Sequence, residues 1–206
     1  MPLVRKPAGV TPDARPDALR VIRELSSQNS DERWAAARNA ASLECTDAAL
    51  ALALRTEEDS RVREAMLTSL ARLGTPVAIE TLLSILRSNI AAFRTAALDA
   101  LRVVKTLPAI QARLLGDPDP DVRILSCELA RSLPATQSSR LLCELIDQEK
   151  NVNVCAAAID VLAEVGDLAA LTSLTACAQR FREIPFLLFA IATVSARINA
   201  SASARD

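Results

Sequence analysis

Histidine is absent from the 206-residue chain, and aromatic residues are scarce. Histidine is the side chain best suited to proton transfer near neutral pH and to metal ligation. Its absence excludes Ser-His-Asp and Cys-His catalytic arrangements, so we expect no catalytic residues, no cofactor and no metal. Aromatic residues make up only 2% of the chain and hydrophobic residues 50%. This composition favours closely packed helices over a β-sandwich.

The chain also lacks a strong charge of either sign, with a net charge of −1 and a pI near 5.7. Nucleic-acid binding needs a basic surface, so we expect no nucleic-acid partner. We find no signal-peptide pattern and no apolar run of the roughly 18 residues that a membrane span requires, and we expect a cytoplasmic protein without membrane contact. The five cysteines include no Cys-x-x-Cys pair, which argues against a disulfide framework or a zinc site.

An internal repeat is the strongest positive signal. Residues 59–74 match residues 119–134 at one fixed offset without gaps. Apolar markers of the repeat recur at intervals of 28 to 32 residues, and Val62, for example, opens a helical face with apolar positions at i, i+3, i+5, i+8 and i+11. These markers are Trp34, Val62, Phe93, Val122 and Val154.

The borders of the predicted helices follow from their end signals. We expect second helices of the repeats over residues 48–55, 77–87, 110–115, 138–147 and 168–179. Glycine and proline near residues 74–76, 116–118, 134 and 166 end the helices. Four residues are predicted as helix N-caps: Asp31, Asp59, Asp119 and Asn151.

The repeated segments resemble the HEAT-repeat family, in the short form of roughly 30 residues known from phycobilin-lyase-like proteins. The family mark is Asp-x-x-Val-Arg followed by Ala and Leu. Residues 59–63 and 119–123 carry it fully, Phe93-Arg94 carries half, and Val154-Cys155 lacks the arginine. The resemblance implies an all-α fold, a right-handed α-solenoid of about five to six HEAT-like helix pairs. We expect a Pro-rich tail at 1–16, one solenoid domain at 17–199 and a frayed end at 200–206.

Two sets of residues are expected to have different roles on such a scaffold. Arg63, Arg94 and Arg123 recur at one repeat position, so stacking aligns them in a structural ladder that faces Asp59 and Asp119. The second helices line the concave surface and offer mixed charges that suit a protein ligand. The side chains expected there are Glu80, Ser84, Arg87, Arg140 and Glu144.

The last predicted helix is unusually apolar for the end of a repeat array. Terminal repeats normally carry a polar outer face, yet Phe186 and Phe189, with Phe181 just before the helix, fall on a stripe apart from the inward-packing residues. We expect this stripe to be either an interface, for a homodimer or a docked protein, or a surface that the chain's own tail covers.

The function that these observations favour is a non-catalytic protein-interaction scaffold or adaptor. Its tail and short repeats are similar to small bacterial HEAT proteins of chemosensory or two-component signalling. The resemblance to phycobilin-lyase-type proteins leaves a bilin-lyase subunit as an alternative, and HEAT-like DNA glycosylases are a second. A glycosylase would need a basic, aromatic groove, for which this composition provides few residues.

Overall fold

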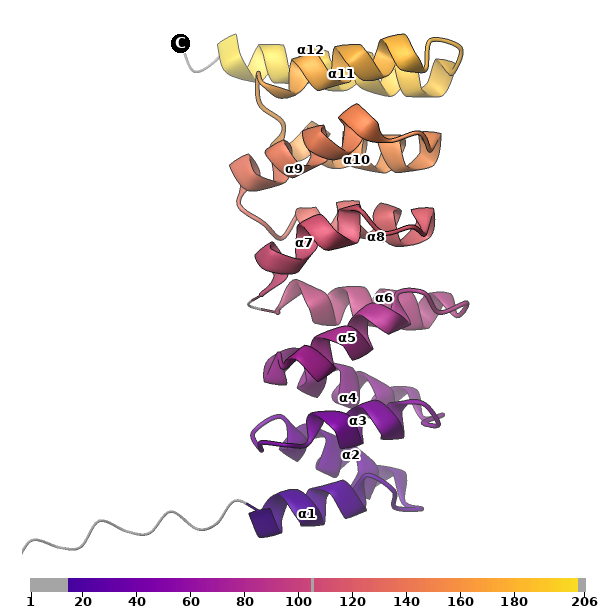
Figure 1. The fold of residues 1–206 in the computed structure, drawn as a ribbon, viewed down its shortest axis with the longest axis vertical. Coiled ribbons are helices and arrows are strands. Elements are labelled where there is room, and N and C mark those ends of the chain that lie inside the picture. The colour runs from indigo at the N-terminus through magenta and orange to yellow at the C-terminus, as the bar shows by residue number, and fades with distance from the viewer. Residues whose placement is uncertain (1–14, 105, 204–206) are drawn as a thin grey trace, which may run out of the picture. The chain divides into compact units, whose positions relative to one another are not determined.

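Helix-forming patterns recur throughout the repeats, and the computed structural model, which describes residues 15–104 and 106–203, has helices and no strands in those ranges. Consecutive helices pack as pairs (Figure 1), which confirms the all-α, HEAT-like prediction. The helices are α1 Arg15–Glu24, α2 Ser30–Ala40, α3 Asp47–Leu54, α4 Ser60–Leu73, α5 Pro76–Ile85, α6 Ala91–Arg102, α7 Leu107–Leu115, α8 Pro120–Ala130, α9 Ala135–Gln148, α10 Val152–Val165, α11 Ala170–Arg180 and α12 Pro185–Ser203.

The helices form two compact units, which divide between Leu82 and Leu83 inside α5. The single domain expected over residues 17–199 stays a prediction. Residues 1–14 of the expected tail and 204–206 of the expected frayed end lie outside the described ranges, whereas residues 200–203 continue α12.

In the first unit, α2 and α4 pack side by side, with α1 against α2 and α3 against α4. Their contact faces are fully buried at Ala36, Ala37, Met66 and Leu70. The Ser69 hydroxyl donates to the Ala37 carbonyl oxygen at 2.7 Å, so the two helices are also joined by a hydrogen bond. Gly74 ends α4 at φ 58°, a left-handed conformation that glycine adopts without strain.

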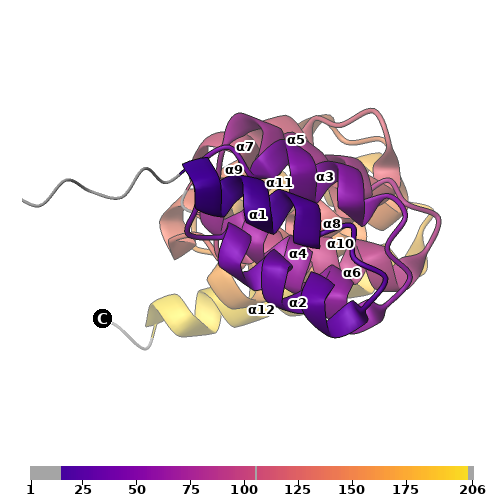
Figure 2. The ribbon, with the colours of Figure 1, turned by 90° about the horizontal axis from the view of Figure 1, so that it is seen from below.

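In the second unit, α8 and α10 pack together, α9 packs on both α10 and α11, and α12 packs on α10 and α11. Seen end-on, α7, α9 and α11 lie in one layer and α8, α10 and α12 in another (Figure 2). Large side chains such as Leu129, Leu142, Ile146 and Leu162 are fully buried between the layers. At roughly 25 cal/mol per Å² of apolar surface, this burial is the main stabilising contribution of the unit.

The helix starts confirm three of the four predicted N-caps. The carboxylate of Asp59 accepts from Arg61 N and Val62 N, Asp119 accepts from Asp121 N, and the Asn151 side chain caps α10 in the same way. The prediction for Asp31 is wrong. Asn29 caps α2, because its side-chain oxygen accepts from Asp31 N at 2.9 Å.

Counting from the Asn29 cap also shifts the alignment of the first repeat with the other repeats by two residues. Trp34 does not occupy the marker position, since the residue three after the Asn29 cap is Glu32. Trp34 instead lies half-buried, with the guanidinium carbons of Arg38 and Arg61 4.7 Å and 5.4 Å from its ring centre. These are cation–π contacts at the protein surface.

Helix α12 corrects the expectation about apolar runs. Within the described residues it is the helix that is long and apolar enough to cross a membrane, by length and composition alone. Only 22% of its apolar window is buried, through four side chains that pack against the rest of the unit: Leu187, Ile191, Val194 and Ile198.

Candidate functional site

A three-residue brace recurs in the loop before each first helix of a repeat. The side chain two residues before the N-cap accepts from the backbone N–H of the cap residue, at 2.7–3.1 Å. The residue four after the cap donates back to the carbonyl oxygen six residues earlier. The five sets are Ser27/Asn29/Arg33, Glu57/Asp59/Arg63, Ser88/Ile90/Arg94, Asp117/Asp119/Arg123 and Glu149/Asn151/Cys155.

The three arginines of the expected ladder each bond a backbone carbonyl oxygen of the brace in their own repeat. Arg94 and Arg123 donate to the carbonyl oxygens of Ser88 and Asp117, each at 2.7 Å, and Arg63 donates to that of Glu57 at 3.2 Å. Asp59 and Asp119, which we expect to face the arginines, accept instead from the backbone at the helix starts. The fifth position holds Cys155, whose sulfur lies 3.9 Å from the Glu149 carbonyl oxygen.

Two of these arginines also pair with a glutamate of the next repeat. Arg33 binds both carboxylate oxygens of Glu57, at 2.7 and 2.9 Å, and Arg123 binds both of Glu149, at 2.7 and 3.1 Å. The glutamate side chains are only 3% and 6% exposed, so each ion pair is mostly shielded from water. A bidentate pair of this kind fixes both distance and orientation between neighbouring repeats.

The pKa values of these glutamates respond to their partners. The hydrogen bond from Arg33 lowers the pKa of Glu57 below its ordinary value, and the Asp59 N–H adds to that effect. For Glu149, burial acts to raise the pKa, but the hydrogen bonds from Arg123, Asn151 N–H and Lys150 N–H together lower it. Both carboxylates are therefore held ionised.

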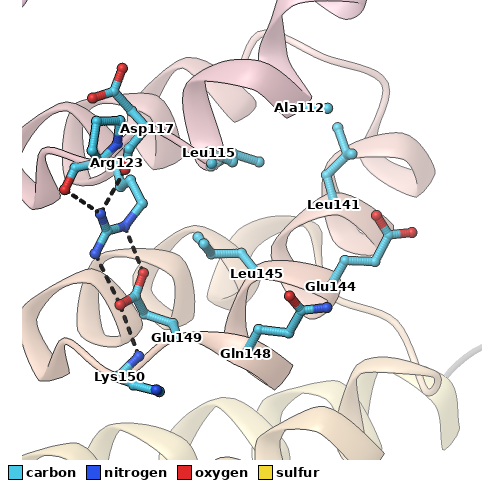
Figure 3. A pocket seen from close by; sticks show the side chains of 12 residues that line it. Ala112, Leu115, Asp117, Arg123, Leu141, Glu144, Leu145, Gln148, Glu149 and Lys150 are labelled. Atoms are coloured by element: carbon cyan, nitrogen blue, oxygen red, sulfur yellow. Dashed lines mark hydrogen bonds and ion pairs between the residues drawn. The ribbon is translucent and has the colours of Figure 1, made fainter.

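The second unit contains a pocket of about 560 Å³ between the loop after α7 and helix α9 (Figure 3). Leu115, Leu141 and Leu145 form its apolar wall. Its charged end is the Arg123–Glu149 pair, and its outer edge carries Glu144, Gln148 and Lys150. The other lining residues are Ala112, Gly116, Asp117 and Pro118.

Each of the three acidic residues that line the pocket has a basic partner. Arg87 forms an ion pair with Asp117, Arg123 with Glu149, and Arg140 with Glu144 at 2.7 Å. A bound ion would have to compete with these pairs. The pocket therefore offers apolar surface and exposed polar edges, without a charge of one sign.

Of the residues expected on the concave surface, Glu144 lines the pocket, and Arg140 and Arg87 reach it through their ion pairs. Glu80 and Ser84 are exposed on α5 and are not among its lining residues. Leu145, Gln148 and the Arg123–Glu149 pair are not predicted from the sequence. One signal for the pair is available in the sequence: a polar residue recurs two positions before each cap.

The three phenylalanines expected at the C-terminal surface lie in two different environments. Phe186 and Phe189 on α12 are 55% and 75% exposed. Phe181 ends α11 and is half-buried, with the Arg180 guanidinium carbon 5.1 Å from its ring centre. The exposed apolar surface of α12 is therefore centred on Phe186 and Phe189.

Within the described part of the chain, no cluster of three or more metal-ligating side chains is present. Three of the five cysteines are fully buried, namely Cys127, Cys155 and Cys177. Burial raises the pKa of the Cys127 thiol to about 12, which removes thiolate character at neutral pH.

In sequence, the chain matches the family described as HEAT repeats over residues 17–102 and 107–183, most of its length. The chain belongs to the HEAT-repeat family. HEAT repeats typically mediate protein interactions, because stacked helix pairs present extended surfaces. No curated protein matches the chain in sequence.

Several solved structures are similar to this HEAT-repeat chain. An archaeal HEAT-like repeats protein from Thermococcus onnurineus is 16% identical, with 90% of this chain and 88% of that chain covered and a TM-score of 0.46. A structure of the CpcE–CpcF complex of phycocyanin lyase from Nostoc is 19% identical, with 96% and 100% covered and a TM-score of 0.41. An engineered protein is 17% identical, with 88% and 94% covered and a TM-score of 0.38.

Proposed function

We propose that this HEAT-repeat chain is a non-catalytic protein-binding module and that the pocket beside α9 holds an apolar side chain of a partner polypeptide. The observation that carries the proposal is the combination of an apolar wall, made by Leu115, Leu141 and Leu145, with acidic groups that already have basic partners. An apolar side chain gains from leaving water in such a pocket. A free ion finds no unpaired cluster of opposite charge there.

The edge of the pocket suits a peptide backbone. Gln148 and Lys150 are exposed beside the apolar wall and present amide and ammonium donors to carbonyl groups of a bound segment. Interfaces of this anatomy place one apolar anchor in a pocket and surround it with polar contacts. The Arg123–Glu149 pair keeps the loop beside the pocket in place before a partner arrives, which limits the entropy lost on binding.

Leu145→Glu tests the pocket. Leu145 is half-exposed on α9, so a glutamate there is tolerated by the fold while it places a charge against the apolar wall. A peptide library displayed on phage would be selected on the wild-type protein alone, and the affinity of the selected peptides would then be measured on the wild type and on Leu145→Glu. We expect these peptides to share an apolar anchor position and to bind the variant at least about tenfold more weakly, a difference of roughly 1.4 kcal/mol.

Leu168→Glu is the matched control, because Leu168 is 56% exposed in the same unit and does not line the pocket. It should leave peptide binding unchanged. Peptides that bind Leu145→Glu as tightly as wild type would contradict the assignment of the pocket, and selected peptides without a common apolar residue would contradict the apolar anchor.

A further inference from the structure

The outward face of α12 includes six exposed residues that present apolar groups to the outside: Phe186, Phe189, Ala192, Thr193, Ala196 and Ala200. Thr193 belongs to this set because its hydroxyl donates to the Phe189 carbonyl oxygen at 2.9 Å, which leaves its methyl group as the outward contact. At 100° per residue, these positions lie opposite the buried stripe of Leu187, Ile191, Val194 and Ile198. The face is thus separate from the core of the unit.

Charge is nearly absent from this face. Arg197, on its edge, is the only charged residue in the sequence of α12. A strongly acidic or basic partner would find no complementary group on the helix. An apolar partner fits, and two copies of the face could meet without repulsion between like charges across its centre.

Side-chain size changes along the face in one direction. Both large residues, Phe186 and Phe189, lie toward the N-terminal end, and the small residues Ala196 and Ala200 lie toward the C-terminal end. A packed interface needs large side chains opposite small ones. A parallel pair of these helices would place phenylalanine against phenylalanine and alanine against alanine, with a gap at one end and crowding at the other.

An antiparallel pair resolves this mismatch. When a two-fold axis passes between Ala192 and Thr193, Phe189 of each helix lies opposite Ala196 of the other, and Phe186 lies near Ala200. The edge residue Arg197 then comes near the phenylalanine of the opposite helix, where its guanidinium can contact the ring face. The same patch serves both partners, as a two-fold interface requires.

We propose that this face of α12 binds the same face of a second copy of the chain, with the two helices antiparallel. This inference goes beyond the peptide pocket and does not rest on it. The α12 face is also formed entirely within the second unit.

Sedimentation velocity from low to high micromolar concentration tests the association. We expect wild-type protein to shift from 22.0 kDa toward twice that mass as concentration rises. Phe189→Asp should remain at the monomer mass throughout, with an unchanged helical circular dichroism spectrum. Leu168→Asp is the matched control, because it adds the same charge at an exposed apolar position outside α12, and it should dimerise like wild type.

A size swap tests the antiparallel register. Phe189→Ala alone leaves a gap and Ala196→Phe alone creates crowding, so each should weaken the dimer. The double variant Phe189→Ala/Ala196→Phe restores one large residue opposite one small residue and should regain most of the association. Recovery is expected in the antiparallel register alone.

Three results would overturn the proposal. Wild-type protein that stays at monomer mass at high micromolar concentration would exclude self-association. A double variant as weak as the single variants would exclude the antiparallel register. Monomeric protein that floats with phosphatidylcholine vesicles, and loses this binding in Phe189→Asp, would assign the face to a lipid surface. Peptide binding at the pocket should be unaffected by Phe189→Asp, so the two proposals can fail separately.

Discussion

Arg123 donates two hydrogen bonds to Glu149 in the next repeat, at 2.7 and 3.1 Å, while a third nitrogen of the same guanidinium donates to the Asp117 carbonyl oxygen at 2.7 Å. The Arg123 side chain thus holds the loop before α8 and joins it to Glu149 at the C-terminal end of α9. The same double role occurs in the first unit, where Arg33 bonds the Ser27 carbonyl oxygen and the Glu57 carboxylate.

Removing Arg123 should destabilise the second unit. Arg123→Met leaves the Glu149 carboxylate, which is 6% exposed, without its charged partner, although the N–H groups of Lys150 and Asn151 still bond it. We expect a loss of about 2–3 kcal/mol in the free energy of unfolding, measured by urea denaturation. In Arg123→Met/Glu149→Gln the uncompensated charge is gone, so the double variant should lose less than Arg123→Met alone. A larger loss in the double variant would show that the buried charge is not the cause.

Acid should weaken the protein through Glu57 and Glu149. Both groups have a folded-state pKa below the ordinary 4.5. Around and below pH 4.5 the folded state therefore binds fewer protons than the unfolded state. Their contribution is complete above pH 4.5 and is lost as the pH falls through the lowered values. In Glu57→Gln/Glu149→Gln, the free energy of unfolding should fall less steeply below pH 4.5, measured by denaturation at a series of pH values. The exposed Glu183→Gln variant is the control and should follow the wild-type slope.

Gly166 should not tolerate a side chain. A Cβ at this position would lie 2.5 Å from the Leu162 carbonyl oxygen and 2.9 Å from Ile198 Cδ1, so α10 or α12 would have to shift. We expect Gly166→Ala to lower the free energy of unfolding by roughly 1–3 kcal/mol, seen as a lower midpoint in thermal unfolding. At Gly116 the nearest atoms to an added Cβ lie 3.6 Å away, an ordinary contact. Gly116→Ala is therefore the matched control, and equal effects would argue against close packing at Gly166.

The cysteines should differ sharply in reactivity. Cys45 is exposed, whereas Cys127, Cys155 and Cys177 are buried. Burial also raises the pKa of Cys127 to about 12, so thiolate and access are both lacking there. Iodoacetamide treatment of the native protein, read by peptide mass spectrometry, should label Cys45 first and the buried three only after denaturation.

Two variants test whether solvent access to the thiols controls the labelling rate in that experiment. Cys45→Ser should remove the fast phase, and Gly166→Ala, by loosening the contact between α10 and α12, should speed the labelling of Cys155. Rapid labelling of Cys127 in the folded wild-type protein would contradict its burial.

The fold could be predicted largely from local patterns. Asp59 and Asp119 are recognisable as caps because each stands before an apolar helical face, and the markers Val62, Val122 and Val154 are indeed fully buried. The first repeat misleads the same reasoning: its marker position holds Glu32, so apolar periodicity moves to Trp34 two residues later. A polar residue at a position that is apolar in the other repeats is enough to shift the predicted alignment of the first repeat.

The pocket could be predicted only in part. Glu144 stands out as a charged residue on a second helix, but the apolar wall joins Leu115 and Leu145 from different repeats. Whether two such side chains enclose a space depends on the separation of their helices, which no pattern within one helix encodes. The pairing of Arg123 with Glu149 cannot be predicted for the same reason, since it spans two repeats.

The three-residue brace affects how such an array can change in evolution. The arginine and the carbonyl group that it bonds lie within one short stretch of chain, so a gene segment that duplicates or exchanges a repeat carries both halves of the bond with it. Arg123 and Glu149, in contrast, are inherited as parts of different repeats. Recombination between them would preserve every brace and break the pairing, so new arrangements of repeats should fold locally first and regain their cross-links by later point mutation.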